Sequence, residues 1–107
     1  MSYKIFITDE FSKNVKKLSK RFKHIKNDLK NLKEELQNGK MGTFIGNNCY
    51  KKRLPNSSSN KGKSGGFRVI CYLQLNDKIF LLSIYSKSDM ENIEEAKLLQ
   101  IIKDNGL

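Results

Sequence analysis

Lysine and arginine are concentrated in the second half of the sequence, on segments with the composition of β-strands. Between residues 49 and 87 the basic residues are Lys51, Lys52, Arg53, Lys61, Lys63, Arg68, Lys78 and Lys87, and the single acid is Asp77. Because side chains alternate between the two faces of a strand, Lys51 and Arg53 share a face, and so do Tyr85 and Lys87. Two or three such cations on one sheet face, beneath a Gly/Lys loop, would form a concave positive site for a polyanion, most commonly nucleic acid.

Aromatic side chains beside this basic surface suit the same kind of ligand. Tyr50, Phe67 and Tyr85 could stack on unpaired bases of RNA. The Gly62-Lys63-Ser64 segment ends like a P-loop, but the first glycine of that pattern would fall at Ser57, and a strand follows where a P-loop needs a helix. We therefore predict no nucleotide-phosphate loop.

The sequence offers no set of metal ligands. Cys49 and Cys71 are the two cysteines and form no CxxC motif, so we expect reduced thiols in or near the core. His24 is the one histidine, and its position off the apolar stripe of a predicted helix indicates an exposed, structurally neutral residue. We predict no metal site and no cofactor.

Length and charge indicate one small basic domain spanning residues 1–107. The 21 Lys+Arg residues against 11 Asp+Glu residues give a net charge of +10, and 37% of the residues are hydrophobic. The longest mostly apolar stretch, 79–85, is far too short to span a bilayer, and residues 1–9 lack the features of a signal peptide. We expect a soluble, cytoplasmic protein that does not bind a membrane.

The first 40 residues predict a strand followed by two helices. Residues 3–7 are rich in β-forming types, and Thr8 then stands where a helix cap would, before two acids. Two apolar stripes at helical spacing follow, Phe11, Val15, Leu18 and Phe22, then Ile25, Leu29, Leu32 and Leu36. They indicate a helical hairpin, or one helix with a break near Lys23, that ends at Gly39.

The remaining residues predict strands and a final helix. The predicted strand segments are 43–45, 49–54, 67–75 and 79–85, with turns at 46–48 and 76–78 and a loop at 55–66. Ser88-Asp89-Met90-Glu91 has the form of a capping box and would open a last helix carrying Ile93, Ala96, Leu99 and Ile102. The predicted class is α+β in the order βααβββα, with the helices on one face of a small antiparallel sheet.

Three segments carry a family resemblance. They are Tyr50–Leu54 (YKKRL), Lys61–Ile70 (KGKSGGFRVI) and Ile84–Ser88 (IYSKS). With the length, element order and basic balance of the chain, they resemble the RelE/HigB-type toxins of bacterial type II toxin–antitoxin modules, in the RelE/ParE superfamily. The resemblance implies a RelE-like fold and an mRNA interferase, an endoribonuclease that inhibits translation by cutting mRNA in the ribosomal A site. It also implies a cognate antitoxin, with operator DNA contacted only through that antitoxin.

The resemblance assigns roles to individual residues. Lys51 and Arg53 match the basic pair on the second strand, Arg68 the arginine after the glycine turn, and Lys87 the basic residue that ends the last strand. Lys61 and Lys63 match the basic loop of the HigB-like branch. We expect catalytic roles for Lys51, Arg53, Lys63, Arg68 and Lys87, and RNA binding by Lys61, Tyr50, Phe67 and Tyr85. Where well-known ribosome-dependent members place a C-terminal tyrosine, this sequence has Ile93, which puts the rate, the cleavage preference or the proton path in doubt.

The chemistry of RNA cleavage suits lysine and arginine. RNA carries its own nucleophile, the 2′-hydroxyl, so a nuclease needs to orient it, remove its proton and stabilise charge on phosphorus, and we expect cleavage without metal. Arg53 and Arg68 stay protonated and would clamp phosphate oxygens. Lys51, Lys63 or Lys87 would act as base or acid, and the sequence does not choose among them.

Other roles remain open for the same residues. Lys51 and Lys87 could contact phosphate without catalysis, and Arg68 could form an ion pair with Glu91 or Glu94. At the level of function, the alternatives are a ParE-like poison of DNA gyrase and a non-catalytic RNA-binding protein, because members of one fold can differ in their sites.

Overall fold

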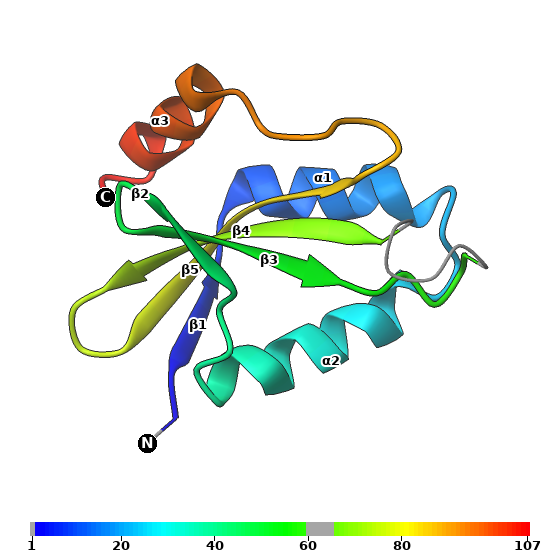
Figure 1. The fold of residues 1–107 in the computed structure, drawn as a ribbon, viewed down its shortest axis with the longest axis horizontal. Helices are drawn as coiled ribbons and strands as arrows, with labels where there is room; N and C mark the ends of the chain where they lie inside the picture. Colours follow the sequence, from blue (N-terminus) through cyan, green and yellow to red (C-terminus); the bar gives the residue numbers. More distant parts are fainter. Residues whose placement is uncertain (1, 60–65) are drawn as a thin grey trace.

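The chain folds into a sheet with helices on both faces (Figure 1). The computed structural model describes residues 2–59 and 66–107, and in these ranges five strands form one sheet in the order β1-β5-β4-β3-β2. The strands are β1 (Lys4–Ile7), β2 (Thr43–Gly46), β3 (Cys49–Leu54), β4 (Phe67–Gln74) and β5 (Lys78–Ser86). The helices are α1 (Asp9–Ser19), α2 (Ile25–Gln37) and α3 (Glu95–Asp104). The predicted α+β class is confirmed. Lys61 and Lys63, two of the predicted site residues, lie outside the described residues.

The sheet is antiparallel except at its first strand. β2, β3, β4 and β5 pair antiparallel, but β1 runs parallel to β5. Two turns close the hairpins with residues of positive φ, Asn47 and Asn48 between β2 and β3, and Asn76 and Asp77 between β4 and β5. Both turns fall where the sequence predicts them. Because the segments 43–46 and 49–54 form separate strands, the observed order has one strand more than the predicted order.

The helical hairpin covers one face of the sheet, as predicted. Thr8 caps α1, since its hydroxyl oxygen accepts a hydrogen bond from the Phe11 amide at 3.2 Å. The chain leaves helical geometry between Ser19 and Ile25, which is the predicted break, and Gly39 with φ of +80° follows the end of α2. The buried side chains of both helices join those of β4 and β5 in the larger core cluster.

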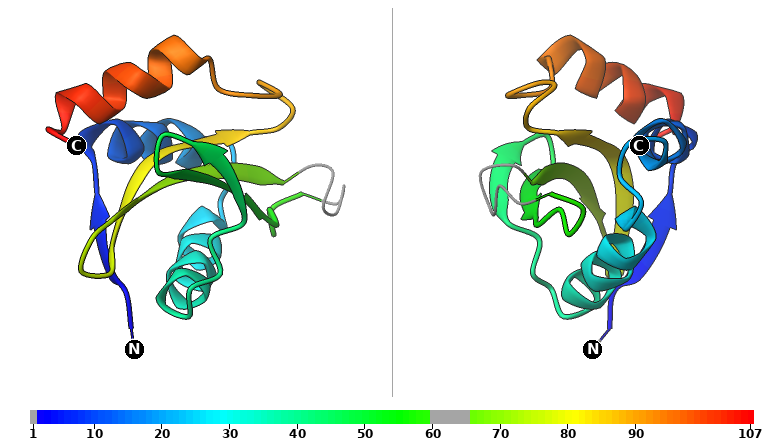
Figure 2. Two further views of the ribbon diagram at one scale, coloured as in Figure 1. Left: turned by 60° about the vertical axis from the view of Figure 1, so that its left-hand side comes forward. Right: turned by 90° about the vertical axis from the view of Figure 1, so that its right-hand side faces the viewer.

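The C-terminal helix differs from its prediction in both its start and its place. α3 begins at Glu95 rather than at the predicted capping box, because the Ser88 hydroxyl is paired with Ser86 and the chain at 87–94 crosses the end of the sheet. Its buried residues are Leu98 and Ile101, whereas Leu99 of the predicted stripe is 43% exposed. Leu98 and Ile101 pack in a second core cluster. The helix α3 that carries them lies on the face of the sheet opposite the helical hairpin (Figure 2). The prediction that all helices share one face is therefore wrong for α3, which covers apolar residues that the hairpin cannot reach.

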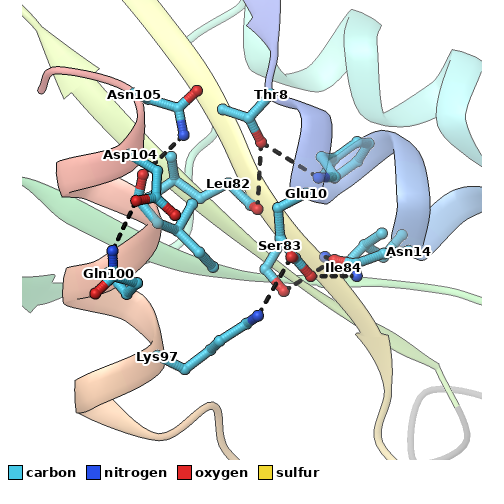
Figure 3. Close-up of polar contacts among 12 residues, drawn as sticks. Thr8, Glu10, Asn14, Leu82, Ser83, Ile84, Lys97, Gln100, Asp104 and Asn105 are labelled. Atoms are coloured by element: carbon cyan, nitrogen blue, oxygen red, sulfur yellow. Dashed lines mark hydrogen bonds and ion pairs between the residues drawn. The ribbon is translucent and has the colours of Figure 1, made fainter.

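Polar contacts join α1, β5 and α3 (Figure 3). The Asn14 side-chain oxygen accepts hydrogen bonds from the Ser83 hydroxyl and the Ile84 amide, both at 3.1 Å. Glu10 accepts one from Asn14 at 2.7 Å and pairs with Lys97 of α3 at 3.3 Å. Although partial burial raises the pKa of Glu10, these contacts outweigh that effect and hold it below its usual value.

Two further predictions concern the core and the membrane. Cys49 and Cys71 are free and buried, and burial raises the pKa of the Cys49 thiol to about 11 and that of Cys71 to about 12. They are therefore inert core residues, as expected. No helix in the ranges 2–59 and 66–107 has the length and apolar character needed to cross a membrane.

Candidate functional site

A hollow of about 670 Å³ lies on the sheet face opposite the helical hairpin. Five basic residues of β3, β4 and the chain after β5 line it, namely Lys51, Lys52, Arg53, Arg68 and Lys87. The Lys52 ammonium pairs with Glu35 of α2, which leaves four cations for the hollow. The start of β2 and the preceding turn border it with Gly42, Thr43 and Ile45, and the chain after β5 borders it with Glu91 and Asn92. The hollow therefore joins residues from four separate segments of the sequence.

The register of the sheet explains why these cations meet. Arg53 of β3 is directly opposite Arg68 of β4, and Arg68 is directly opposite Tyr85 of β5. Directly opposed residues point to the same face of a sheet, and Lys51 shares the face of Arg53 because the two are separated by one residue. Strand alternation predicts the shared face of Lys51 and Arg53 from the sequence, whereas the register that adds Arg68 and Tyr85 to that face is seen in the structure.

Arg68 is the most buried of the cations that line the hollow and is held by the sheet. It is 3% exposed, and its Nη1 donates a hydrogen bond to the Phe67 carbonyl at 3.1 Å. Among the described residues it forms no ion pair, so the alternative of a pair with Glu91 or Glu94 is not what the structure contains. Its guanidinium charge is thus not neutralised by a carboxylate of the described chain.

Hydrogen bonds hold the two lysines that lie beside Arg68 in the hollow, Lys51 and Lys87. The Lys51 ammonium donates a hydrogen bond to the side-chain oxygen of Asn92. The Lys87 amide donates to the Gly66 carbonyl at 3.1 Å, which fixes the backbone where β5 ends. Lys52, in contrast, points to the other face and pairs with Glu35 of α2 at 3.2 Å, so its role is structural.

Gly42 lets the chain before β2 approach β3 closely. Its φ is +92°, and a Cβ at this position would lie 2.3 Å from the Lys51 carbonyl oxygen. Only a residue without a side chain fits this contact. Gly42 therefore helps to set the wall of the hollow next to Lys51.

The beginning of the predicted basic loop is anchored on α2. The carboxylate of Asp28, a residue that is 3% exposed, accepts a hydrogen bond from the Ser57 amide at 3.1 Å. The backbone amide of His24 donates to the Ser58 hydroxyl at 2.9 Å. His24 itself is exposed, as predicted, and does not line the hollow.

Comparison with known proteins places the chain in a family. The family model described as the RelE toxin of the RelE/RelB toxin–antitoxin system matches residues 3–104. The chain belongs to the RelE toxin family. It is therefore a toxin of the toxin–antitoxin type, and its family implies a cognate antitoxin as partner.

A solved structure shows the same fold. The chain is similar to the free E. coli toxin RelE in a double arginine-to-alanine mutant, with a TM-score of 0.59 and 16% sequence identity. The match covers 97% of this chain and 98% of the E. coli chain. Among curated proteins, no relative matches the sequence.

The three aromatic residues predicted to bind RNA in this RelE-family toxin lie in different environments. Phe67 is fully buried in the core, with its ring 5.3 Å from that of Phe22, so it offers no surface to a base. The ring of Tyr50 packs against Phe44, and its place in β3 puts it on the face opposite Lys51. We therefore leave both residues out of the site.

Tyr85 shares the face of the hollow but is covered. It is 6% exposed and lines a smaller cavity of about 240 Å³ next to the hollow. Among residues 2–59 and 66–107, its hydroxyl finds no hydrogen-bond partner. Burial raises the pKa of this phenol, and the nearby backbone of Ile93 and the charge of Arg68 oppose that shift with smaller effects.

Sequence reasoning missed the uncharged residues of this RelE-family site. The predicted last helix contains Asn92, and Gly42 lies between two predicted elements. Neither has a local sequence signal, because Asn92 acquires its role from a contact with Lys51 and Gly42 from the close approach of the chain before β2 to β3. Within residues 2–59 and 66–107, no three His, Cys, Asp or Glu side chains form a group that could hold a metal ion.

Proposed function

We propose that this RelE-family toxin is an endoribonuclease that inhibits translation by cutting mRNA in the ribosomal A site. The observation that supports it most directly is the hollow lined by Lys51, Arg53, Arg68 and Lys87, in which three of the cations come from separate strands or strand ends. A concave cluster of cations attracts a polyanion such as the phosphate backbone of RNA.

The two arginines suit the binding of the scissile phosphate. Arginine remains charged at all relevant pH values and presents a planar fork of donors to phosphate oxygens. Arg68 lies at the floor and Arg53 beside it, so both could donate to the non-bridging oxygens as negative charge develops in the transition state. We assign phosphate binding and transition-state stabilisation to these residues.

The two lysines suit proton transfer. In sheet order, Lys51 on β3 and Lys87 after β5 lie on either side of Arg68 on β4. One lysine would accept the proton of the 2′-hydroxyl while its oxygen attacks phosphorus. The bond from phosphorus to the 5′-oxygen then breaks, and the other lysine would protonate that oxygen. The products are a 2′,3′-cyclic phosphate, which becomes a 3′-phosphate if water then opens it, and a 5′-hydroxyl. The steps use no metal.

The basic loop and the partners complete the proposal. We assign RNA binding to Lys61 and a catalytic or binding role to Lys63, on the basis of the family resemblance. The ribosome and its mRNA are the proposed target, the antitoxin the proposed inhibitor, and operator DNA is reached through the antitoxin.

A reconstituted translation reaction tests the proposed function. Purified protein is added to mRNA with and without ribosomes, with EDTA in a ribosome-free sample, and the 5′ ends of the mRNA are mapped by primer extension. Cuts in register with codons, found only on translated message, are the expected result. Intact message in all samples would overturn the proposal and lead to an assay for cleavage complexes of DNA gyrase. Salt-sensitive RNA binding without any cut would instead identify a passive RNA-binding protein.

A further inference from the structure

The chain between β5 and α3 crosses beside the hollow, and two of its side chains contact distant parts of the sequence. Residues 87–94 have no regular structure and connect the end of β5 to the start of α3 (Figure 1). Asp89 in this segment pairs with Arg21, which follows α1, at 2.6 Å. Three residues further on, the side-chain oxygen of Asn92 accepts a hydrogen bond from the Lys51 ammonium. The contact between Asn92 and Lys51 thus ties the segment to a residue with a proposed function in the hollow.

The chemistry of the Asn92 contact suits the positioning of a cation. An ammonium carries three N–H donors, so one bond to Asn92 leaves two for an RNA oxygen. The carboxamide is neutral, so it orients Lys51 without cancelling its charge. Glu91 lines the same hollow, but in the described part of the chain it forms no ion pair with any of the cations. A lysine side chain has many rotamers, and a fixed acceptor reduces the number that it samples.

We propose that Asn92 is a positioning residue of this toxin, which holds the Lys51 ammonium where it meets the reacting 2′-hydroxyl or phosphate. The inference rests on the proposed function and adds to it a residue outside the basic set. It acts through Lys51 and makes no contact with RNA itself.

Coupling between the two residues tests the inference. In the translation assay, Asn92→Ala is expected to lower the rate of cleavage about tenfold in a fold-competent protein, the loss typical of a mispositioned catalytic group. In a Lys51→Ala background the same substitution should cause no further loss, because residues that act as a unit are non-additive. A full additional loss in that background would overturn the positioning role.

A second substitution in the same segment serves as the matched control. Asp89→Asn removes the ion pair to Arg21, leaves Asn92 in place, and should keep cleavage within about threefold of the parent, since exposed ion pairs contribute little. Thermal unfolding of each variant checks that the fold is retained. Equal losses in Asp89→Asn and Asn92→Ala would mean that only the general anchoring of the segment matters, and would contradict a specific role for Asn92.

A measurement on Lys51 itself separates this inference from the proposed function. Nitrogen-15 relaxation of the lysine ammonium groups reports how ordered each one is. The order parameter of Lys51 is expected to exceed that of the surface lysines and to fall to their level in Asn92→Ala. If the parent protein cuts no RNA, the proposed function fails, and this order parameter still decides whether Asn92 holds Lys51. An order parameter unchanged by Asn92→Ala overturns the inference even where the parent cleaves RNA.

Discussion

Arg53 and Arg68 are directly opposite each other on β3 and β4, and neither forms an ion pair within the described residues. Side chains at such positions have Cβ atoms about 4.5–5.5 Å apart, and like charges there destabilise a sheet. The fold tolerates this repulsion on the face where Lys51 and Lys87 add further positive charge. A bound polyanion would relieve the repulsion, so the arrangement favours polyanion binding at a cost to the stability of the free protein.

Replacing Arg68 should reduce RNA cleavage far more than replacing a distant cation. Arg68→Ala removes the buried guanidinium at the floor of the hollow and is expected to slow cleavage at least tenfold, equivalent to roughly 1.4 kcal/mol of transition-state stabilisation. Lys78→Ala is the control, because Lys78 lies at the opposite end of β5 from Lys87. Cleavage at the parental rate by a folded Arg68→Ala protein would remove Arg68 from the site.

Anion binding should stabilise the free protein through the same residues. A ligand that binds only the folded state at ten times its Kd adds about 1.4 kcal/mol to the free energy of unfolding. Phosphate is therefore expected to raise the Tm of the parent more than that of the Arg53→Ala/Arg68→Ala double variant. The comparison at equal salt is needed because phosphate also stabilises proteins by exclusion from their surface. Equal shifts in the two proteins would show that no anion site exists at these arginines.

The placement of the cations follows from the sequence because period-two alternation is a local property of strands. Lys51 and Arg53 share a face for that reason, whereas Arg68 joins them through the register of β3 and β4. The same rule assigns Phe67, next to Arg68, to the opposite face, where the structure buries it. Proximity to the basic residues in the sequence was a misleading guide for Phe67 and Tyr50. The cap at Thr8 could also be predicted from the sequence, because its hydroxyl accepts a hydrogen bond from an amide within the first turn of the helix.

The start of α3 could not be read in the same way. The pattern Ser88-x-x-Glu91 is a local signal, but Asp89 is paired with Arg21 from a distant part of the chain and Asn92 with Lys51. Tertiary contacts of this kind override a capping propensity that contributes about 1 kcal/mol. Which face α3 covers depends on what the helical hairpin leaves exposed, and that is decided only when the sheet is assembled.

The close approach of Gly42 to β3 predicts an asymmetry between two glycines. Gly42→Ala should destabilise the protein by backbone strain of about 1–3 kcal/mol and by an added clash with the Lys51 carbonyl. Gly46→Ala is the matched control, because its φ of +93° is similar while no atom lies within 4 Å of a Cβ there. Chemical denaturation of both variants measures the difference. A decrease in the free energy of unfolding that is no larger in Gly42→Ala than in Gly46→Ala would show that the backbone at Lys51 can move away from the added Cβ without destabilising the protein.

Acid stability should depend on the contacts of Glu10 with Asn14 and Lys97. The pKa of Glu10 in the folded protein lies below its ordinary value, because these contacts favour the charged carboxylate more than burial disfavours it. A group with a lowered folded pKa contributes stability that is complete above the unfolded pKa and is lost as the pH falls through the folded pKa. Between neutral pH and the acid range, the parent should therefore lose more stability than Glu10→Gln, which has no proton to bind. Lys97→Met removes one of the contacts and should give an intermediate pH dependence. Urea denaturation at a series of pH values measures the free energy of unfolding of each protein. The same pH dependence in the parent and in Glu10→Gln would show that the neighbours of Glu10 do not stabilise its carboxylate in the folded state.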